Sequence, residues 1–320
     1  MRIAFTAFLL LSLACPPPAD AASTLRISGP PIAESVPLLV MAQDDREWEQ
    51  DFDAQFIPWH SPDMLRAMVA GGQVDAAIVT TAAASALRNK GVNCRVALLH
   101  ESPVWIVSTK PGPDTLESLE GTLLFPFGPG EMPELFYRAT MAGKPCRITT
   151  RHTGGSLEAV NLLLAGRGDH AMLSEPTASV AVLRSKSLHT EGAPLLVKRV
   201  DMRKAWGRAF PKHHLAASCV AFFGPEADNH LKIQAFNRTY AQACQWMQEN
   251  PDQALTLVRK KFPALASQMR QGTMDDFTVR ILSGTQAQTD ALFFLNKIYG
   301  ISPGAVGGSM PGKDLFEVGQ

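Results

Sequence analysis

Apolar and polar residues follow one another along this chain in two periods, and the first third shows both. Met64, Leu65, Met68 and Val69 recur at the three- and four-residue spacing of a helix that buries one face. A continuous apolar run, Ala76–Val79, follows and has the length of a buried strand. Small residues then lead into a stretch that ends in Arg and Lys. The pattern predicts a helix, a strand, a loop and a second helix.

The same succession returns in the middle of the chain. Leu157, Val160, Leu163 and Leu164 form the helical stripe, and Ala171–Leu173 form the strand. In each copy an aspartate precedes the strand and a hydroxyl ends it: Asp75 and Thr80 in the first, Asp169 and Ser174 in the second. We interpret the two copies as two α/β lobes of similar build, the alternative being a chance likeness of two α/β units.

Strands alternate with helices through most of the chain, which predicts an α/β protein with mostly parallel sheets flanked by helices. Residues 193–206 and 215–227 read as strands, and the pattern becomes helical after Asn229. We expect one lobe from residues 22–110 plus 214–320 and another from residues 111–213, joined by crossings near Lys110–Gly112 and His213–Ala217.

Composition narrows the functional classes. The chain has 320 residues, a hydrophobic fraction of 46% and no net charge, which allow a sizeable core in two lobes. A nucleic-acid surface would need a basic excess, so none is expected. No internal apolar run is long enough and uncharged enough to be a membrane span.

The N-terminus has the features of a secretory signal. An apolar stretch follows Arg2, and Ala19-Asp20-Ala21 forms a cleavage motif, so residues 1–21 are predicted to be removed on export to the periplasm. The alternative is a lipid anchor on Cys15, which we favour less because Ser12 stands where a lipoprotein signal prefers Leu. In an oxidising compartment one disulfide or only buried free thiols are possible among the remaining cysteines, Cys94, Cys146, Cys219 and Cys244.

Hydroxyl side chains mark the ends of both matched strands. Ligands of open α/β sheets bind beyond the carboxyl ends of strands, where helix N-termini offer free N–H groups. Thr80, Thr81 and Ser174 stand at these ends, followed by small residues that would let a ligand approach the backbone. They are candidate ligand contacts, and simple capping of the following helices is the alternative.

Further candidates lie at other strand ends. The Gly/Pro loop with Gly128 and Gly130, and the loop with Thr153 and Gly154, suit anion recognition through backbone N–H groups, although ordinary turns would look alike. Trp59 could stack on a ligand in a cleft or pack in the core. For Glu175 we favour a role at the start of the following helix over contact with a cationic ligand.

Two apparent motifs do not hold. Gly307, Gly312 and Lys313 fit a phosphate-binding loop, but Asp314 replaces the required Ser or Thr and no long helix can follow. The pair His213-His214 lacks further metal ligands at a recognisable spacing. We therefore expect no cofactor and no metal.

Taken in order, several segments resemble type II periplasmic solute-binding proteins of ABC transporters, in the branch that serves nitrate, sulfonates, taurine and thiamine precursors. The segments are "AMVAGGQVDAAI", "TLESLEGTLL", "LLLAGRGDHAMLSEP" and "GISPGAVGGSMPGKDLF". The resemblance implies a two-lobed clamshell, expected to be a monomer, that closes on a small solute and delivers it to a permease in the inner membrane. The sequence departs from the family after the first strand: it has Pro31 and Glu34 there, where family members often have an aromatic residue.

The predicted ligand contacts are Pro31, Glu34, Trp59, Thr80, Thr81, Gly128, Gly130, Thr153, Gly154 and Ser174. The expected solute is a small organic or inorganic anion or a heteroaromatic precursor, and no enzymatic step is expected. Two alternatives stay open: a pyrimidine-precursor synthase of the same fold, and a periplasmic sensor for a membrane kinase.

Overall fold

The computed structural model describes residues 24–43, 52–189, 192–269, 273 and 278–316. The predicted signal peptide, including Cys15, lies outside the described residues.

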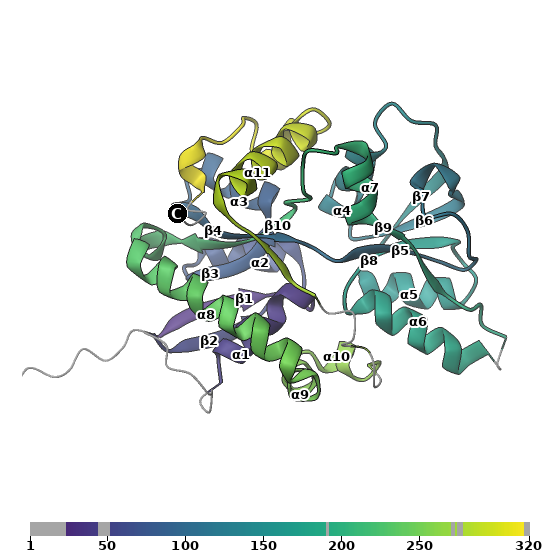
Figure 1. Ribbon diagram of the computed structural model, residues 1–320, viewed down its shortest axis with the longest axis horizontal. Helices are drawn as coiled ribbons and strands as arrows, with labels where there is room; N and C mark the ends of the chain where they lie inside the picture. The colour runs from purple at the N-terminus through teal and green to yellow at the C-terminus, as the bar shows by residue number, and fades with distance from the viewer. Residues whose placement is uncertain (1–23, 44–51, 190–191, 270–272, 274–277, 317–320) are drawn as a thin grey trace, which may run out of the picture.

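Two β-sheets lie side by side along the long axis of the molecule (Figure 1). The strands of the first are β1 Leu25–Gly29, β2 Ala54–Pro58, β3 Ala76–Thr80, β4 Cys94–Glu101, β10 Ser218–Phe223 and β11 Arg280–Leu282, in the spatial order β11-β4-β10-β3-β1-β2. The strands of the second are β5 Val104–Ser108, β6 Glu120–Pro126, β7 Arg147–Thr153, β8 His170–Ser174 and β9 Val197–Asp201, in the order β7-β6-β8-β5-β9. We call the two halves lobe 1 and lobe 2.

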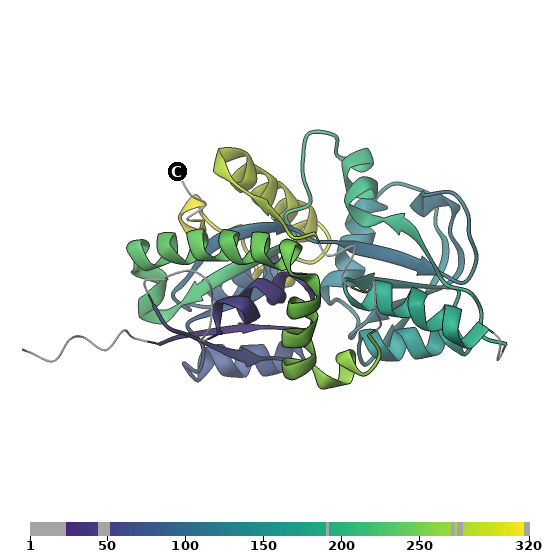
Figure 2. The ribbon, with the colours of Figure 1, turned by 60° about the horizontal axis from the view of Figure 1, so that its bottom comes forward.

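Helices cover both sheets, and the three-layer arrangement is visible from two directions (Figures 1 and 2). Those of lobe 1 are α1 Val36–Met41, α2 Pro62–Ala70, α3 Thr81–Asn89, α8 His230–Glu249, α9 Pro251–Lys261, α10 Pro263–Ala266 and α11 Gly284–Tyr299. Those of lobe 2 are α4 Met132–Thr140, α5 Ser156–Leu164, α6 Thr177–Leu188 and α7 Met202–Ala209. The α/β two-lobed class predicted from the sequence is confirmed.

The two sheets share one strand order. Around β3 the order is β2-β1-β3-β10-β4, and around β8 it is β7-β6-β8-β5-β9. In both sheets the central strand pairs parallel with the strand on one side and antiparallel with the strand on the other. The helix–strand–helix repeat predicted from the sequence thus reflects a repeated topology.

The expectation of mostly parallel pairing is wrong. β10 pairs antiparallel with β3 and β4, and β5 pairs antiparallel with β8 and β9. Each of these strands enters its sheet from the other lobe, beginning beside the carboxyl end of the central strand: Ser218 lies opposite Thr80, and Val104 opposite Ser174. A strand that enters at that edge must run away from it, so its direction opposes that of its neighbour.

The chain also crosses between sheets earlier than expected. Sheet membership changes between Glu101 of β4 and Val104 of β5, before the crossing predicted near Lys110–Gly112. The return lies between β9 and β10 and includes the segment His213–Ala217. The division of the chain into lobe segments at residues 110 and 213 remains a prediction, and sheet membership favours a first boundary at residues 102–103.

A second correction concerns residues 193–206, which were expected to be strand throughout. Only β9 is strand, and α7 begins at Met202 because the Asp201 carboxylate accepts a hydrogen bond from the Arg203 N–H at 2.9 Å. An aspartate at this position satisfies a free N–H group of the first helical turn.

Aromatic side chains join the lobes on one side of the crossing strands. The Trp206 ring of α7 lies 5.8 Å from Phe136 of α4, 4.5 Å from Phe210 and 5.6 Å from Phe294 of α11. The Trp206 side chain is fully buried. We call this set, with Phe293 of α11, the junction cluster.

Candidate functional site

A cavity of about 740 Å³ lies between the lobes. Lobe 1 contributes Pro30, Pro31, Ile32, Glu34, Trp59, His60, Pro62, Ile78, Val79, Thr80, Ala217, Ser218 and Phe262–Leu265. Lobe 2 contributes Val104, Pro126, Phe127, Glu131, Met132, Pro133, Phe136, Gly154–Glu158, Met172, Ser174 and Thr177, and Ser102 lies at the crossing. The carboxyl ends of β3 and β8 both reach the cavity, as expected for open α/β sheets.

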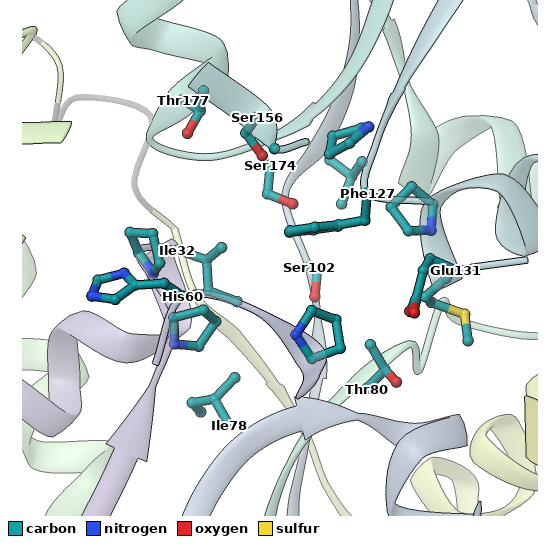
Figure 3. Close-up of a pocket in the computed structure, with 18 of the residues that line it drawn as sticks. Ile32, His60, Ile78, Thr80, Ser102, Phe127, Glu131, Ser156, Ser174 and Thr177 are labelled. Atoms are coloured by element: carbon teal, nitrogen blue, oxygen red, sulfur yellow. The ribbon is translucent and has the colours of Figure 1, made fainter. Parts of the chain in front are cut away.

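Six of the ten predicted contacts lie in this wall: Pro31, Glu34, Trp59, Thr80, Gly154 and Ser174. They come from both lobes and from segments far apart in the sequence. Figure 3 shows Thr80 and Ser174 on opposite sides of the cavity. The structure therefore brings together the two strand ends that the repeat singles out.

Thr80 has a structural task as well as a place in the wall. Its hydroxyl accepts a hydrogen bond from the Ala83 N–H at 3.1 Å and caps α3. Thr81 does not line the cavity: its side chain is fully buried and donates a hydrogen bond to the Ala216 carbonyl at 2.7 Å. As the first residue of α3, Thr81 turns towards Ala216, which is why it does not reach the cavity while Thr80 does.

Three further predicted contacts also lie outside the wall. The Thr153 side chain is buried, and its hydroxyl donates to the Gly155 carbonyl at 3.0 Å. Gly128 and Gly130 are exposed on the loop before α4, and the Gly130 N–H donates to the Glu134 carboxylate at 2.8 Å. This loop folds on itself instead of presenting its N–H groups to the cavity.

Glu175 acts at the start of a helix, as favoured from the sequence. Its carboxylate accepts a hydrogen bond from the Ser179 N–H of α6 at 3.1 Å and lies 2.5 Å from the Lys198 ammonium group. Burial raises the pKa of Glu175, and the attraction of Lys198 opposes that shift. The pair fixes the N-terminus of α6, which borders the cavity at Thr177.

Glu34 is the most unusual polar residue of the wall. Its side chain is 1% exposed, and neither carboxyl oxygen has a hydrogen-bond partner among the described residues. Burial raises the pKa of Glu34, and the nearby Ser102 hydroxyl opposes this without cancelling it. A buried carboxyl group without a partner costs folding free energy, so the position is a candidate for ligand contact.

Phe127 is a wall residue that the sequence prediction missed. Its ring extends into the middle of the cavity (Figure 3), and its backbone φ of 70° is positive. A bulky residue in this region is rare and strained, and such residues cluster at functional sites. The Gly/Pro loop after Phe127 predicted a turn. It did not indicate that the aromatic residue before the turn would face the cavity.

The segment Phe262–Leu265, at the end of α9 and in α10, was missed for a different reason. It reaches the cavity from the C-terminal helices, at the lower centre of Figure 1, and carries no motif of its own. Ser102 likewise has no distinctive sequence neighbourhood. Only the packing of the helices places these residues at the site.

Two hydrogen bonds cross from lobe to lobe at the cavity side. The Ala33 N–H donates to the Glu175 carbonyl at 2.9 Å, and the Arg184 guanidinium donates to the Gln268 side-chain oxygen at 2.6 Å. Arg184 also donates to Asn161 of its own lobe at 3.0 Å. These contacts join the two lobes beside the cavity.

The remaining candidate groups take no part in the cavity wall. His213 hydrogen-bonds Asp290 at 3.0 Å and stacks on Phe293. Among the described residues, no cluster of three His, Cys, Asp or Glu side chains could hold a metal ion, and no helix has the length and apolar character of a membrane span. Cys94, Cys146, Cys219 and Cys244 are unpaired, and only Cys146 is exposed.

Comparison with known proteins identifies the fold. No known family model and no curated sequence matches the chain. Among solved structures, an ABC transporter protein from Parabacteroides distasonis matches with a TM-score of 0.71 at 19% identity, over 93% of this chain and 99% of that one. The aliphatic sulphonate-binding protein SsuA of Escherichia coli matches with a TM-score of 0.64 at 16% identity, over 92% and 96%.

A third match is the nitrate-binding protein NrtA of Synechocystis PCC 6803, with a TM-score of 0.60 at 12% identity over 92% of this chain and 87% of that one. These neighbours are periplasmic binding proteins and other ABC-transporter proteins, as the sequence resemblance predicts. The chain has the two-lobed fold of the periplasmic binding proteins of ABC transporters.

Proposed function

We propose that this protein is the extracytoplasmic solute-binding component of an ABC importer. The observation that supports this most strongly is the cavity of about 740 Å³ with walls from both lobes. A volume of this size suits a small molecule. Contacts from both lobes exist together only in the closed arrangement, so a solute shifts the population towards closure.

In this proposal the closed protein delivers its solute to a permease in the inner membrane, and no covalent step is required. The fold shared with SsuA and NrtA, whose names state sulphonate and nitrate binding, supports the assignment to solute capture. Export by the predicted signal peptide and action as a monomer belong to the same proposal.

Native mass spectrometry of the protein purified from its own host tests solute capture. We expect a co-purified small molecule bound one to one. Ser174→Trp places a large side chain in the cavity and should remove the adduct. Ser187→Trp changes an exposed position of α6 in the same lobe and should retain it. Wild-type protein without any adduct, or an adduct that survives Ser174→Trp, contradicts capture in this cavity.

A second measurement separates import from sensing. The wild-type protein should stimulate ATP hydrolysis by the importer permease and ATPase of its host when these are reconstituted in proteoliposomes, and Ser174→Trp should not. Stimulation of a membrane kinase in place of the importer would replace the import role with a sensing role while leaving solute capture intact.

A further inference from the structure

The cavity wall has a charge composition that does not suit an anion. Among the described residues that line it there is no Lys and no Arg, whereas Glu34, Glu131 and Glu158 all contribute. Burying an anion without a compensating positive charge costs several kcal/mol, of the order of the loss for any unpaired buried ion. An anionic solute would also meet the repulsion of the Glu131 and Glu158 carboxylates at the wall.

Two backbone N–H groups of the loops beside the cavity are already taken by carboxylates of the protein. The Gly154 N–H donates to the Glu158 carboxylate at 2.6 Å. The Gly130 N–H donates to Glu134; burial opposes ionisation of this carboxyl, but the Gly130 N–H and His152 prevail and lower the pKa of Glu134. The first turns of α4 and α5 have no side-chain cap, so the N–H groups of these two turns are not occupied in this way.

The helices that point at the cavity from the two central strands are also capped internally. The Thr80 hydroxyl accepts from the first turn of α3, and the Glu175 carboxylate accepts from the first turn of α6. A helix N-terminus attracts an anion through unsatisfied N–H groups, and each cap removes one of them. The electrostatic attraction expected for an anion is thus reduced at α3 and α6.

The rest of the wall is mostly apolar. Ile32 and Ile78 face the cavity from lobe 1, and Phe127, Met132 and Met172 face it from lobe 2. Apolar surface removed from water contributes about 25 cal/mol per Å² to binding before the costs of association. Such a wall favours a solute with a large apolar surface.

Three wall residues carry buried side-chain polar atoms without a hydrogen-bond partner among the described residues: Glu34, Trp59 and Ser218. Both carboxyl oxygens of Glu34 are unpartnered at a site that is 1% exposed. A carboxylate accepts hydrogen bonds, and a protonated carboxyl group also donates one. A hydroxyl, carbonyl or N–H group of the solute would satisfy it without bringing a charge into the cavity.

Resting on the proposed function, we propose that the cavity takes an uncharged, largely apolar solute that places one hydrogen-bonding group against Glu34. The proposal departs from the anionic solute expected from the sequence. It combines the absence of Lys and Arg from the described wall, the largely apolar lining, and the unpartnered carboxyl group of Glu34.

A matched series of naphthalene compounds tests the charge class by isothermal titration calorimetry at neutral pH. The probes are 2-naphthol, naphthalene-2-sulfonate and 2-naphthyltrimethylammonium, which share a ring and differ in charge. We expect 2-naphthol to bind at least about tenfold more tightly than either ion, a difference of about 1.4 kcal/mol. Ser174→Trp should abolish this binding, and Ser187→Trp should preserve it.

Each other outcome overturns the inference. Tighter binding of the sulfonate would establish an anion site, and tighter binding of the ammonium compound a cation site, and both would leave solute capture intact. Binding of 2-naphthol to Ser174→Trp would place it outside the cavity. Failure of all three probes contradicts the apolar assignment, and the native mass spectrum then decides separately whether the cavity holds a solute.

Two substitutions sharpen the assignment. Met132→Lys places a cation in the wall and should improve sulfonate binding about tenfold, with Met132→Leu as the matched control. Glu34→Gln keeps a donor and an acceptor and should hold the affinity for 2-naphthol within about threefold, whereas Glu34→Leu should weaken it about fivefold. Naphthalene, which has no hydroxyl group, should bind equally to both Glu34 variants; a parallel loss would contradict the role of Glu34.

Discussion

The lobes meet in two regions of opposite character. On one side the junction cluster packs Trp206 against four rings, at centroid distances of 4.5–6.2 Å, with no water-exposed surface on the indole. At the cavity side the lobes meet through two hydrogen bonds, Ala33 to Glu175 and Arg184 to Gln268, and through Val180 of α6, which belongs to an apolar cluster of lobe 1. Aromatic burial contributes far more free energy than a partly exposed hydrogen bond.

This difference indicates how the molecule can move. The junction cluster stabilises the contact between lobes whether or not a solute is present, because Trp206, Phe210 and Phe294 do not line the cavity. We expect the cavity side, where no such group of rings joins the lobes, to open while the junction side stays packed. The predictions below test this division of roles, beginning with the largest effect.

Removing the central ring should break the junction. Trp206→Ala should lower the free energy of unfolding by about 3–5 kcal/mol, because it deletes a fully buried indole and leaves a cavity among four rings. Chemical denaturation measures this loss. Trp206→Phe keeps a ring and should cost much less; equal losses in the two variants would show that ring packing is not what holds the lobes here.

Filling the cavity should affect binding and spare stability. Ser174→Trp should weaken the solute affinity by about a hundredfold or more, or about 2.8 kcal/mol, with thermal unfolding close to wild type in the absence of solute. Calorimetry and a thermal melt measure the two quantities. Normal binding by this variant would show that the end of β8 is not part of the binding surface.

The unpartnered carboxyl group predicts a specific pH dependence. Burial raises the folded-state pKa of Glu34 above its ordinary 4.5, so the unfolded chain ionises first as pH rises and the folded state loses stability, by about 1.4 kcal/mol per pH unit, until the folded-state pKa is reached. Glu34→Gln should therefore be more stable than wild type above pH 4.5, by a margin that grows through this window and vanishes below it.

Urea unfolding at a series of pH values measures that margin. Glu131→Gln is the matched control, because it removes a half-exposed carboxylate from the same wall. A constant difference between Glu34→Gln and wild type at every pH would contradict the raised pKa.

The smallest effect is expected at the breakable contact. Gln268→Ala removes the partner of Arg184 across the lobes and should weaken solute affinity about fivefold, since we expect that hydrogen bond to form on closure. Asn161→Ala removes the partner within lobe 2 and should leave the affinity unchanged. Calorimetric titration compares the two variants, and an equal loss in both would mean that closure does not involve this bond.

Much of the fold could be predicted from the sequence because it depends on local patterns. The stripe of Met64 to Val69 and the apolar run that ends at Thr80 predict α2 and β3, and the same pattern predicts α5 and β8. The position of Thr80 and Ser174 at the cavity follows from the same patterns, since strands that share an order and direction end at the same edge.

What could not be predicted depends on long-range contacts or on single-residue orientation. Thr81 differs from Thr80 by one position, yet it points to Ala216 because it belongs to the helix and not to the strand. The direction of β5 and β10 follows from the edge at which each enters its sheet, which no local pattern records. The hydrogen bond from the Gly130 N–H to the Glu134 carboxylate forms only in the folded loop. The sequence therefore suggested an anion site where the structure has an internal hydrogen bond.

The central claim is that one solute contacts both lobes in the cavity between them. Hydrogen–deuterium exchange, compared between the protein with its co-purified solute and the protein after partial unfolding and dialysis, tests it directly. The account predicts slower exchange with solute at residues 78–83 of lobe 1 and at residues 126–134 and 154–159 of lobe 2 together. Protection confined to one lobe, or no difference between the two samples, would contradict it.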